Sequence, residues 1–355
     1  MSSVHTIAMC EGQWAQRTAS GDWRGYAARC GVLAPVSDGL APFAGAEFEL
    51  LEQRLAACIA PVHGRLMDEV TGAHDEIGLV RWLREGWDQR GEPAVQRLAV
   101  SLTRDRGADM NAAGEVFAWR RYRLRCAHFL PHVPMGHKCG RLHGHDFEVI
   151  VHTRVQTGED GFSKLDEAWA PLHFALNYRK LNEIKGLENP TSENMSAWIW
   201  AQLGGALPGL AWVTVFETQS CGANFDGRNY RIWKEFTFDS ATQWLRAPAE
   251  HPAARVHGHT YTLRLHLKGP IDELLGWTQD FGDVKRAFAP QFDQLDHQPL
   301  HELAPELDGG SKAWAAHIAL RAHATIPALE RVTLLEGPNG GAMWLSQDEF
   351  LPLPL

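Results

Sequence analysis

Residues 122–130, YRLRCAHFL, and residues 143–145, HGH, decide how this chain of 355 residues is organised. The first stretch is echoed by residues 236–244, FTFDSATQW, and the second recurs as His257-Gly-His259, each 114 positions further along. Later matches are 119 positions apart, so an insertion of five residues separates two gapless blocks. They include Leu181 with Leu300 and Glu217 with Glu336. Self-similarity at a fixed spacing predicts tandem structural units.

We predict three repeats, covering residues 1–118, 119–234 and 235–355. The first is the most eroded, and its assignment depends on aligning residues 50–70 with residues 165–184. The alternative is an unrelated N-terminal α+β domain. Each repeat is expected to run strand, strand, helix, helix, strand, strand.

The second repeat shows this local pattern most clearly. Residues 147–152, FEVIVH, form a β-branched run that predicts a strand. Thr191 precedes a segment with apolar residues at helical spacing, so we expect it to be the N-cap of a helix.

Composition narrows the class of protein. Hydrophobic residues make up 45% and charged residues 22%, as in globular proteins, and a net charge of −9 disfavours binding to nucleic acid or anionic membranes. No apolar run reaches the roughly 18 residues of a membrane span, and the N-terminus does not resemble a signal peptide. The six cysteines are scattered without a CxxC pair. We therefore expect a cytoplasmic protein.

Three histidines have the pattern of a metal site. His143 and His145 are two apart at the start of an expected strand, so their side chains share one face. His128 ends the preceding strand and meets them if the two strands pair as a hairpin. Three neutral imidazoles leave a fourth tetrahedral position open, which is typical of catalytic zinc. The alternative is a pair of surface histidines flanking a turn glycine.

Residues 127–145, AHFLPHVPMGHKCGRLHGH, resemble the signature of the tunnelling-fold pterin synthases, the 6-pyruvoyl-tetrahydropterin synthase/6-carboxytetrahydropterin synthase family. The spacing C-x-x-x-H-G-H from Cys139, and residues 185–200, resemble the carboxy branch, which serves queuosine biosynthesis. The close match covers the second repeat. The resemblance implies an α+β fold of three tandem ββααββ tunnelling-fold repeats, which form a pseudo-trimeric β-barrel with helices outside. It also implies a homodimer of stacked barrels.

The resemblance further implies a chemistry. The family's substrate is 7,8-dihydroneopterin triphosphate, which loses triphosphate; the carboxy branch also cleaves a carbon–carbon bond and releases acetaldehyde. The catalytic Zn²⁺ would be held by His128, His143 and His145 and would polarise substrate oxygens. Cys139 would accept a proton from carbon, with its pKa lowered by the nearby cation. Glu217 would anchor the paired N–H groups of the pterin ring.

The second repeat departs from the family at one point. The family uses an Asp-His pair in a segment like L-D-H-x-x-L-N, where this repeat has Asn177 and Tyr178. Neither side chain can replace an imidazole as a proton relay near pH 7. The third repeat keeps the pair as Asp296 and His297.

The third repeat has lost the other half of the site. Thr242 stands at the position of the first zinc ligand, and Ala253 at that of the cysteine. In the resembling family one subunit supplies the catalytic cysteine and its neighbour supplies the Asp-His pair. We therefore predict that this chain is a fused trimer with one composite site. The second repeat supplies zinc ligands, thiol and anchor, and the third supplies Asp296 and His297. If the first repeat faces Cys139 instead, the site receives Val62 and His63; that repeat also has Arg104 at the anchor position.

The function predicted from these residues is a zinc-dependent lyase that makes 6-carboxy-5,6,7,8-tetrahydropterin. Two alternatives stay open: a 6-pyruvoyl-tetrahydropterin synthase, and a non-catalytic relative that binds pterin. A zinc hydrolase or cyclohydrolase of the same fold is less favoured, because such enzymes usually use cysteine as a metal ligand.

Overall fold

The computed structural model describes residues 2–17, 20–37, 39–91, 93–308 and 310–347. These residues hold twelve strands, which form one closed barrel in the order β1-β12-β11-β10-β9-β8-β7-β6-β5-β4-β3-β2. The strands are β1 (Ser3–Arg17), β2 (Trp23–Ala34), β3 (Arg97–Thr103), β4 (Arg106–Asn111), β5 (Val116–His128), β6 (His143–Val155), β7 (Leu210–Thr218), β8 (Cys221–Phe225), β9 (Tyr230–Thr242), β10 (His257–Gly269), β11 (Leu329–Gly337) and β12 (Gly340–Leu345). The eight α-helices of the described residues are α1 (Glu47–Ile59), α2 (Met67–Thr71), α3 (Glu76–Asp88), α4 (Gly161–Leu176), α5 (Ser192–Leu203), α6 (Phe281–Phe292), α7 (Leu300–Leu303) and α8 (Gly310–Ala322). The predicted α+β class is confirmed.

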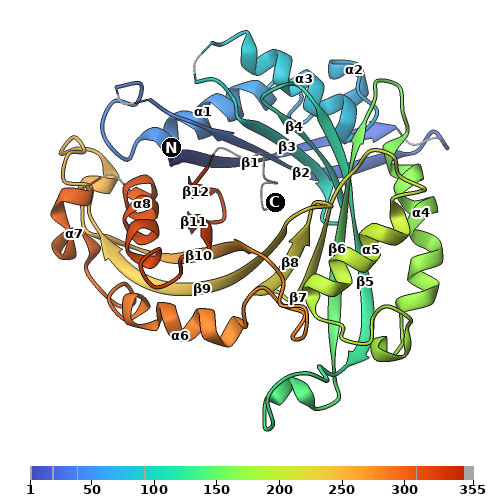
Figure 1. The fold of residues 1–355 in the computed structure, drawn as a ribbon. Helices are drawn as coiled ribbons and strands as arrows, with labels where there is room; N and C mark the ends of the chain where they lie inside the picture. Colours follow the sequence, from blue (N-terminus) through green and yellow to red (C-terminus); the bar gives the residue numbers. More distant parts are fainter. Residues whose placement is uncertain (1, 18–19, 38, 92, 309, 348–355) are drawn as a thin grey trace. The chain divides into compact units, whose positions relative to one another are not determined.

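The chain divides into two compact units. The first unit comprises residues 1–116, 236–265 and 287–355, and the second comprises residues 117–235 and 266–286. In the first unit α1 and α3 pack on the strands of the N-terminal part, and α8 packs on β11 and β12 (Figure 1). In the second unit α5 packs on β7 and β8, while α4 contacts β6. None of the described helices is both long and apolar enough to cross a membrane.

Helix α5 begins where the sequence predicts. Thr191 is its N-cap, and the Thr191 hydroxyl accepts the Asn194 N–H at 3.1 Å. That bond satisfies one of the N–H groups that every helix leaves unpaired in its first turn. The cap fixes the entry of α5 and with it the two residues that follow, Ser192 and Glu193.

One hydrogen-bond pattern occurs three times within the described residues. In each case a residue with positive φ donates its N–H to a strand carbonyl, and the side chain before it accepts the N–H of that same strand residue. In the first occurrence Gly64 (φ 70°) bonds to Gln13, which also donates to the His63 side chain. In the second, Tyr178 (φ 58°) bonds to Arg125, which also donates to the Asn177 side chain. In the third, His297 (φ 57°) bonds to Asp239, which also donates to the Asp296 side chain. The recurrence in residues 1–116 supports the proposal of a first repeat.

This pattern corrects two details of the first repeat. His63 and Gly64, not Val62 and His63, correspond to Asp296 and His297. The residue that corresponds to Glu217 is likewise Leu102, not Arg104.

The shift at the anchor position follows from β-bulges. The β7–β8 pairing is irregular between Phe216 and Thr218, and the β11–β12 pairing between Leu335 and Gly337, so Glu217 and Glu336 are the residues at these bulges. The β3–β4 pairing shifts between Val100 and Thr103. Counting back from Thr103, the counterpart of the two glutamates is the buried Leu102, not Arg104. The first repeat thus has no carboxylate there.

The hairpins also differ in length. Strand β1 ends at Arg17 and β2 begins at Trp23, whereas residues 129–142 separate β5 from β6 and residues 243–256 separate β9 from β10. The first hairpin therefore has no room for the segment that carries Cys139 in the second repeat.

Candidate metal centre and its surroundings

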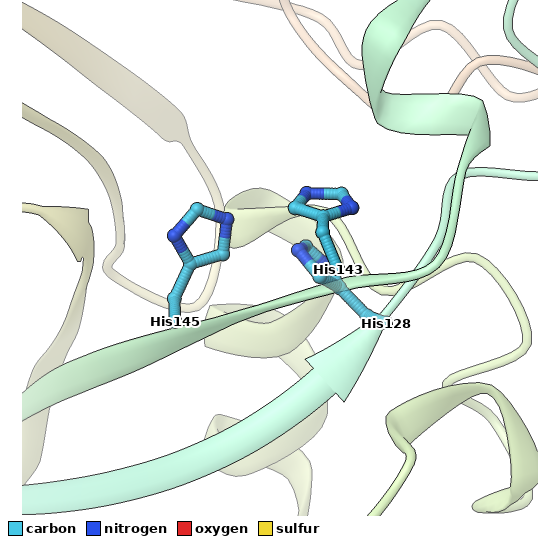
Figure 2. Close-up of side chains that lie close together, drawn as sticks. All are labelled: His128, His143 and His145. Carbon is cyan, nitrogen blue, oxygen red and sulfur yellow. The ribbon is translucent and has the colours of Figure 1, made fainter.

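The hairpin of β5 and β6 brings the three predicted ligands together. His128 is the last residue of β5, and His143 and His145 open β6. Their ring centroids are 4.5, 5.2 and 5.1 Å apart, and one nitrogen from each lies within 4.8 Å of the others (Figure 2). Among the residues that the structure describes, this is the one group of histidine, cysteine and carboxylate side chains arranged to hold a metal ion.

Backbone carbonyls orient two of these rings. Nδ1 of His128 donates to the Pro190 carbonyl at 3.0 Å, and Nδ1 of His143 donates to the Arg141 carbonyl at 2.7 Å. A neutral imidazole with its proton on Nδ1 leaves Nε2 free to bind a metal, and such outer bonds fix the ring.

Burial favours the metal-binding form of the rings. It lowers the pKa of His128 and of His145, so both are neutral at pH 7. Their Nε2 atoms are buried and have no hydrogen-bond partner in the described part of the chain. Buried polar atoms are normally satisfied, and a cation would satisfy both. The donor set therefore fits a divalent ion that prefers nitrogen ligands.

Cys139 lies on a 3₁₀ helix, Lys138–Gly140, in the loop between β5 and β6. Burial, followed by the negative charge of Glu217, raises the pKa of its thiol. The protein by itself thus works against the lowered pKa that we expected. The charge of Lys138 acts in the opposite direction, and a bound cation would add to it.

Glu217 lies beside the histidines at the end of β7. Its Oε1 is 3.5 Å from Nε2 of His145, and its Oε2 accepts the Ser192 hydroxyl at 2.9 Å. The β7 bulge re-aims this side chain, as bulges near functional sites often do.

A second carboxylate near this site was missed by sequence reasoning. Glu193 is buried, and its Oε1 accepts the Thr278 N–H at 2.9 Å. Burial raises its pKa to about 7, and the charge of Glu217 adds to the effect. Its place after a helix N-cap was the only sequence signal, and exposed acids are common there.

Residues 275–280, between β10 and α6, contact the site although they belong to the third predicted repeat. The Asn189 amide donates to the Leu275 carbonyl at 2.8 Å, and the Thr191 hydroxyl donates to the Gly276 carbonyl. The loop composition of this segment gave no sign of these contacts.

Asp296 and His297 belong to the first unit and form the predicted pair. His297 Nδ1 lies 3.0 Å from Asp296 Oδ1, and the imidazole is 77% exposed. The positive φ of His297 is uncommon for a residue with a side chain and marks local strain. Whether this pair serves Cys139 stays a prediction.

A family model described as 6-pyruvoyl tetrahydropterin synthase matches residues 118–228 and 231–345. The chain belongs to the 6-pyruvoyl tetrahydropterin synthase family. The tunnelling fold is thereby confirmed in two tandem copies; the first repeat and the bounds of all three stay predictions.

Three known proteins align with parts of the chain. It is 40% identical over 118 residues to the 6-carboxy-5,6,7,8-tetrahydropterin synthase of Synechocystis sp., an alignment that covers 30% of this chain and 90% of that protein. It is 38% identical over 71 residues to the dihydroneopterin monophosphate aldolase of Pyrococcus furiosus, an alignment that covers 19% of this chain and 60% of that protein. The structure of Caenorhabditis elegans 6-pyruvoyl tetrahydropterin synthase aligns with a TM-score of 0.30 at 20% identity. The alignment covers 32% of this chain and 94% of that chain.

The second family copy contains a partial counterpart of the metal site. The rings of His257 and His259 are again 5.1 Å apart, and Nδ1 of His257 donates to the Arg255 carbonyl at 2.7 Å, as His143 does to Arg141. Thr242 replaces the third imidazole, as the sequence indicates. This copy therefore keeps the frame of the site without its full donor set.

Proposed function

We propose that the chain is a zinc-dependent lyase that converts 7,8-dihydroneopterin triphosphate to 6-carboxy-5,6,7,8-tetrahydropterin. The observation that carries this proposal is the group of three imidazoles with Glu217 3.5 Å from one of them and Cys139 on the adjoining loop. The name of the Synechocystis relative, which matches over 90% of its length, supports the carboxy product.

Zinc is the metal we propose for His128, His143 and His145. Three neutral nitrogen ligands with an open fourth position are typical of catalytic zinc, which polarises substrate oxygens when bound. The carbonyls of Pro190 and Arg141 keep two of the rings in place before any ligand arrives. Preorganised donors of this kind lower the cost of reorganisation during the reaction.

Two side chains of the second unit would handle the substrate directly. Glu217 would accept two N–H groups of the aminopyrimidinone ring, while the Ser192 hydroxyl holds its Oε2. The Cys139 thiolate would accept a proton from the carbon side chain.

The proton relay in this proposal comes from the third repeat, as Asp296 and His297. Two observations support that choice over the first repeat. Residues 275–280 of the third repeat already contact the second repeat's site, and along the chain they lead through α6 to the pair. The first repeat offers only His63 and Gly64 at the corresponding positions.

A turnover assay tests the proposal. Wild type and His297→Asn are compared with 7,8-dihydroneopterin triphosphate, with the zinc content of both measured. Asparagine tolerates positive φ, so this variant keeps the backbone. We expect wild type to release triphosphate and acetaldehyde, and the variant to keep zinc but lose turnover.

The same assay separates the alternatives. Triphosphate without acetaldehyde would identify the pyruvoyl product, and binding without turnover would identify a pterin-binding protein. Turnover of dihydroneopterin monophosphate instead would point to the activity named for the Pyrococcus relative. We also propose a homodimer, which a monomeric elution volume in gel filtration would contradict.

A further inference from the structure

The turn that carries the Cys139 thiol has little stability of its own. It is a single 3₁₀ turn of three residues, Lys138–Gly140, and so short a helix cannot offset the cost of its nucleation. Two outside groups hold it. The Leu130 N–H donates to the Cys139 carbonyl at 2.8 Å, and Nδ1 of His137 accepts the Cys139 N–H at 3.2 Å.

The His137 ring in turn faces an acid. Because Nδ1 accepts a hydrogen bond, the neutral ring carries its proton on Nε2. Nε2 lies 3.5 Å from Oδ2 of Asp280, a distance that a small shift converts into a hydrogen bond to a charged acceptor. The ring also lies against Trp277, with centroids 6.1 Å apart.

Asp280 is itself firmly held. Its other oxygen, Oδ1, accepts the N–H groups of Gly282 at 2.8 Å and Asp283 at 3.1 Å, so the side chain caps the start of α6. One carboxylate thus ties the first turn of α6 to the loop that bears the thiol. The link joins residues of the third predicted repeat to the proposed catalytic turn of the second.

The first unit contains the same arrangement without a thiol. Nδ1 of His251 accepts the Ala253 N–H at 3.2 Å, and its Nε2 lies 3.2 Å from Oε2 of Glu49 in α1. Ala253 occupies the position of Cys139. The chain therefore offers a matched control in which the same turn is braced by the same kind of pair but carries no reactive group.

We propose that His137 and Asp280 are positioning residues that fix the Cys139 thiol. His137 caps the turn, and Asp280 sets the orientation of the His137 ring. The catalytic consequence rests on the proposed function, but the effect on the thiol itself does not. Neither residue needs to touch the substrate.

Two substitutions remove the interaction between His137 and Asp280 while each keeps the hydrogen bonds that the residue makes to backbone N–H groups. In His137→Asn the side-chain oxygen still accepts the Cys139 N–H, but the reach to Asp280 is lost. In Asp280→Asn the residue still caps α6. The charge of Asp280 also raises the pKa of the Cys139 thiol, so His137→Asn, which leaves that charge in place, is the decisive variant.

The first readout is alkylation of Cys139 by iodoacetamide in metal-free protein, with mass spectrometry to distinguish the six cysteines. We expect the rate to rise about fivefold in His137→Asn, because a looser turn exposes the half-buried thiol. His251→Asn, the matched control, should alkylate Cys139 at the wild-type rate. Equal rates in His137→Asn and wild type would overturn the proposal.

The second readout is turnover of the zinc-loaded protein. In His137→Asn we expect kcat to fall about tenfold while KM and zinc content stay within about twofold, because the thiol is misplaced and the ligands are not. An unchanged kcat would contradict the positioning role. If wild type shows no turnover, the proposed function fails, and the alkylation rates still decide the positioning pair.

Discussion

Substitution of Glu217 by glutamine tests the proposed pterin anchor with little change in shape. The carboxylate lies at the β7 bulge, where Oε2 accepts the Ser192 hydroxyl and Oε1 faces the metal centre. Glutamine can keep the bond from Ser192 through its own oxygen. Its amide nitrogen then points at the ligand, where a pterin presents N–H donors.

The size of the effect follows from these contacts. A hydrogen bond to a charged group contributes about 1.5–3 kcal/mol, and the variant loses one such bond and places two donors face to face. We expect a loss of about 2–3 kcal/mol, which is roughly a 30- to 150-fold weaker Kd. Zinc content should not change, since the three imidazoles are untouched.

The assay is calorimetric titration of zinc-loaded protein with 7,8-dihydroneopterin, which lacks the triphosphate. The matched control is Glu336→Gln, at the corresponding bulge of β11, where the carboxylate accepts the Ser311 N–H. We expect Glu336→Gln to bind within about twofold of wild type. A Glu217→Gln variant that binds within about threefold of wild type, or equal losses in both variants, would refute the anchor.

Three further substitutions probe the metal, the thiol and the buried acid. His143→Ala should lose zinc to a chelator at least about 100-fold more readily than wild type, whereas the control His257→Ala should hold zinc as wild type does. If a competition titration shows that His143→Ala retains zinc as well as wild type, the proposed ligand set is wrong. Cys139→Ala should keep zinc and pterin binding while kcat falls by about 10²–10⁴, and a near-normal turnover number would eliminate the thiol as proton acceptor. Burial raises the Glu193 pKa from 4.5 to about 7, so the folded state holds this proton more tightly than the unfolded state and stability falls as pH rises through that window. Glu193→Gln should therefore gain up to roughly 3 kcal/mol on wild type between pH 5 and pH 8, and a difference in Tm that does not vary with pH would contradict the buried acid.

The sequence predicted what local geometry determines. His143 and His145 are two apart on a strand and therefore share a face, and His128, at the end of the preceding strand, meets them when the two strands pair as a hairpin. Strand periodicity and hairpin pairing were therefore enough to predict the three metal ligands. Glu217 was found through the family pattern. The reason for its position, the bulge after Phe216, became clear only in the strand pairing.

What the sequence missed depends on contacts between distant segments. Glu193 and Thr278 are 85 positions apart, and no local pattern marks an acid as buried. The alignment of the first repeat was off by one residue at the Asp-His pair and by two residues at the anchor position, because eroded sequence offers no fixed point. The positive φ of Gly64 and of His297 supplied such a point. The raised pKa of Cys139 likewise reflects burial and a neighbouring carboxylate that spacing cannot reveal.

The central claim is that one chain supplies both halves of the catalytic site. It is tested most directly by co-expressing Cys139→Ala and His297→Asn chains under two affinity tags, purifying complexes that contain both, and assaying turnover beside the wild type. If thiol and imidazole act within one chain, neither chain holds a complete site, and we predict no turnover above that of either variant alone. Recovery of a substantial fraction of wild-type turnover would place the two groups on different chains and contradict the claim.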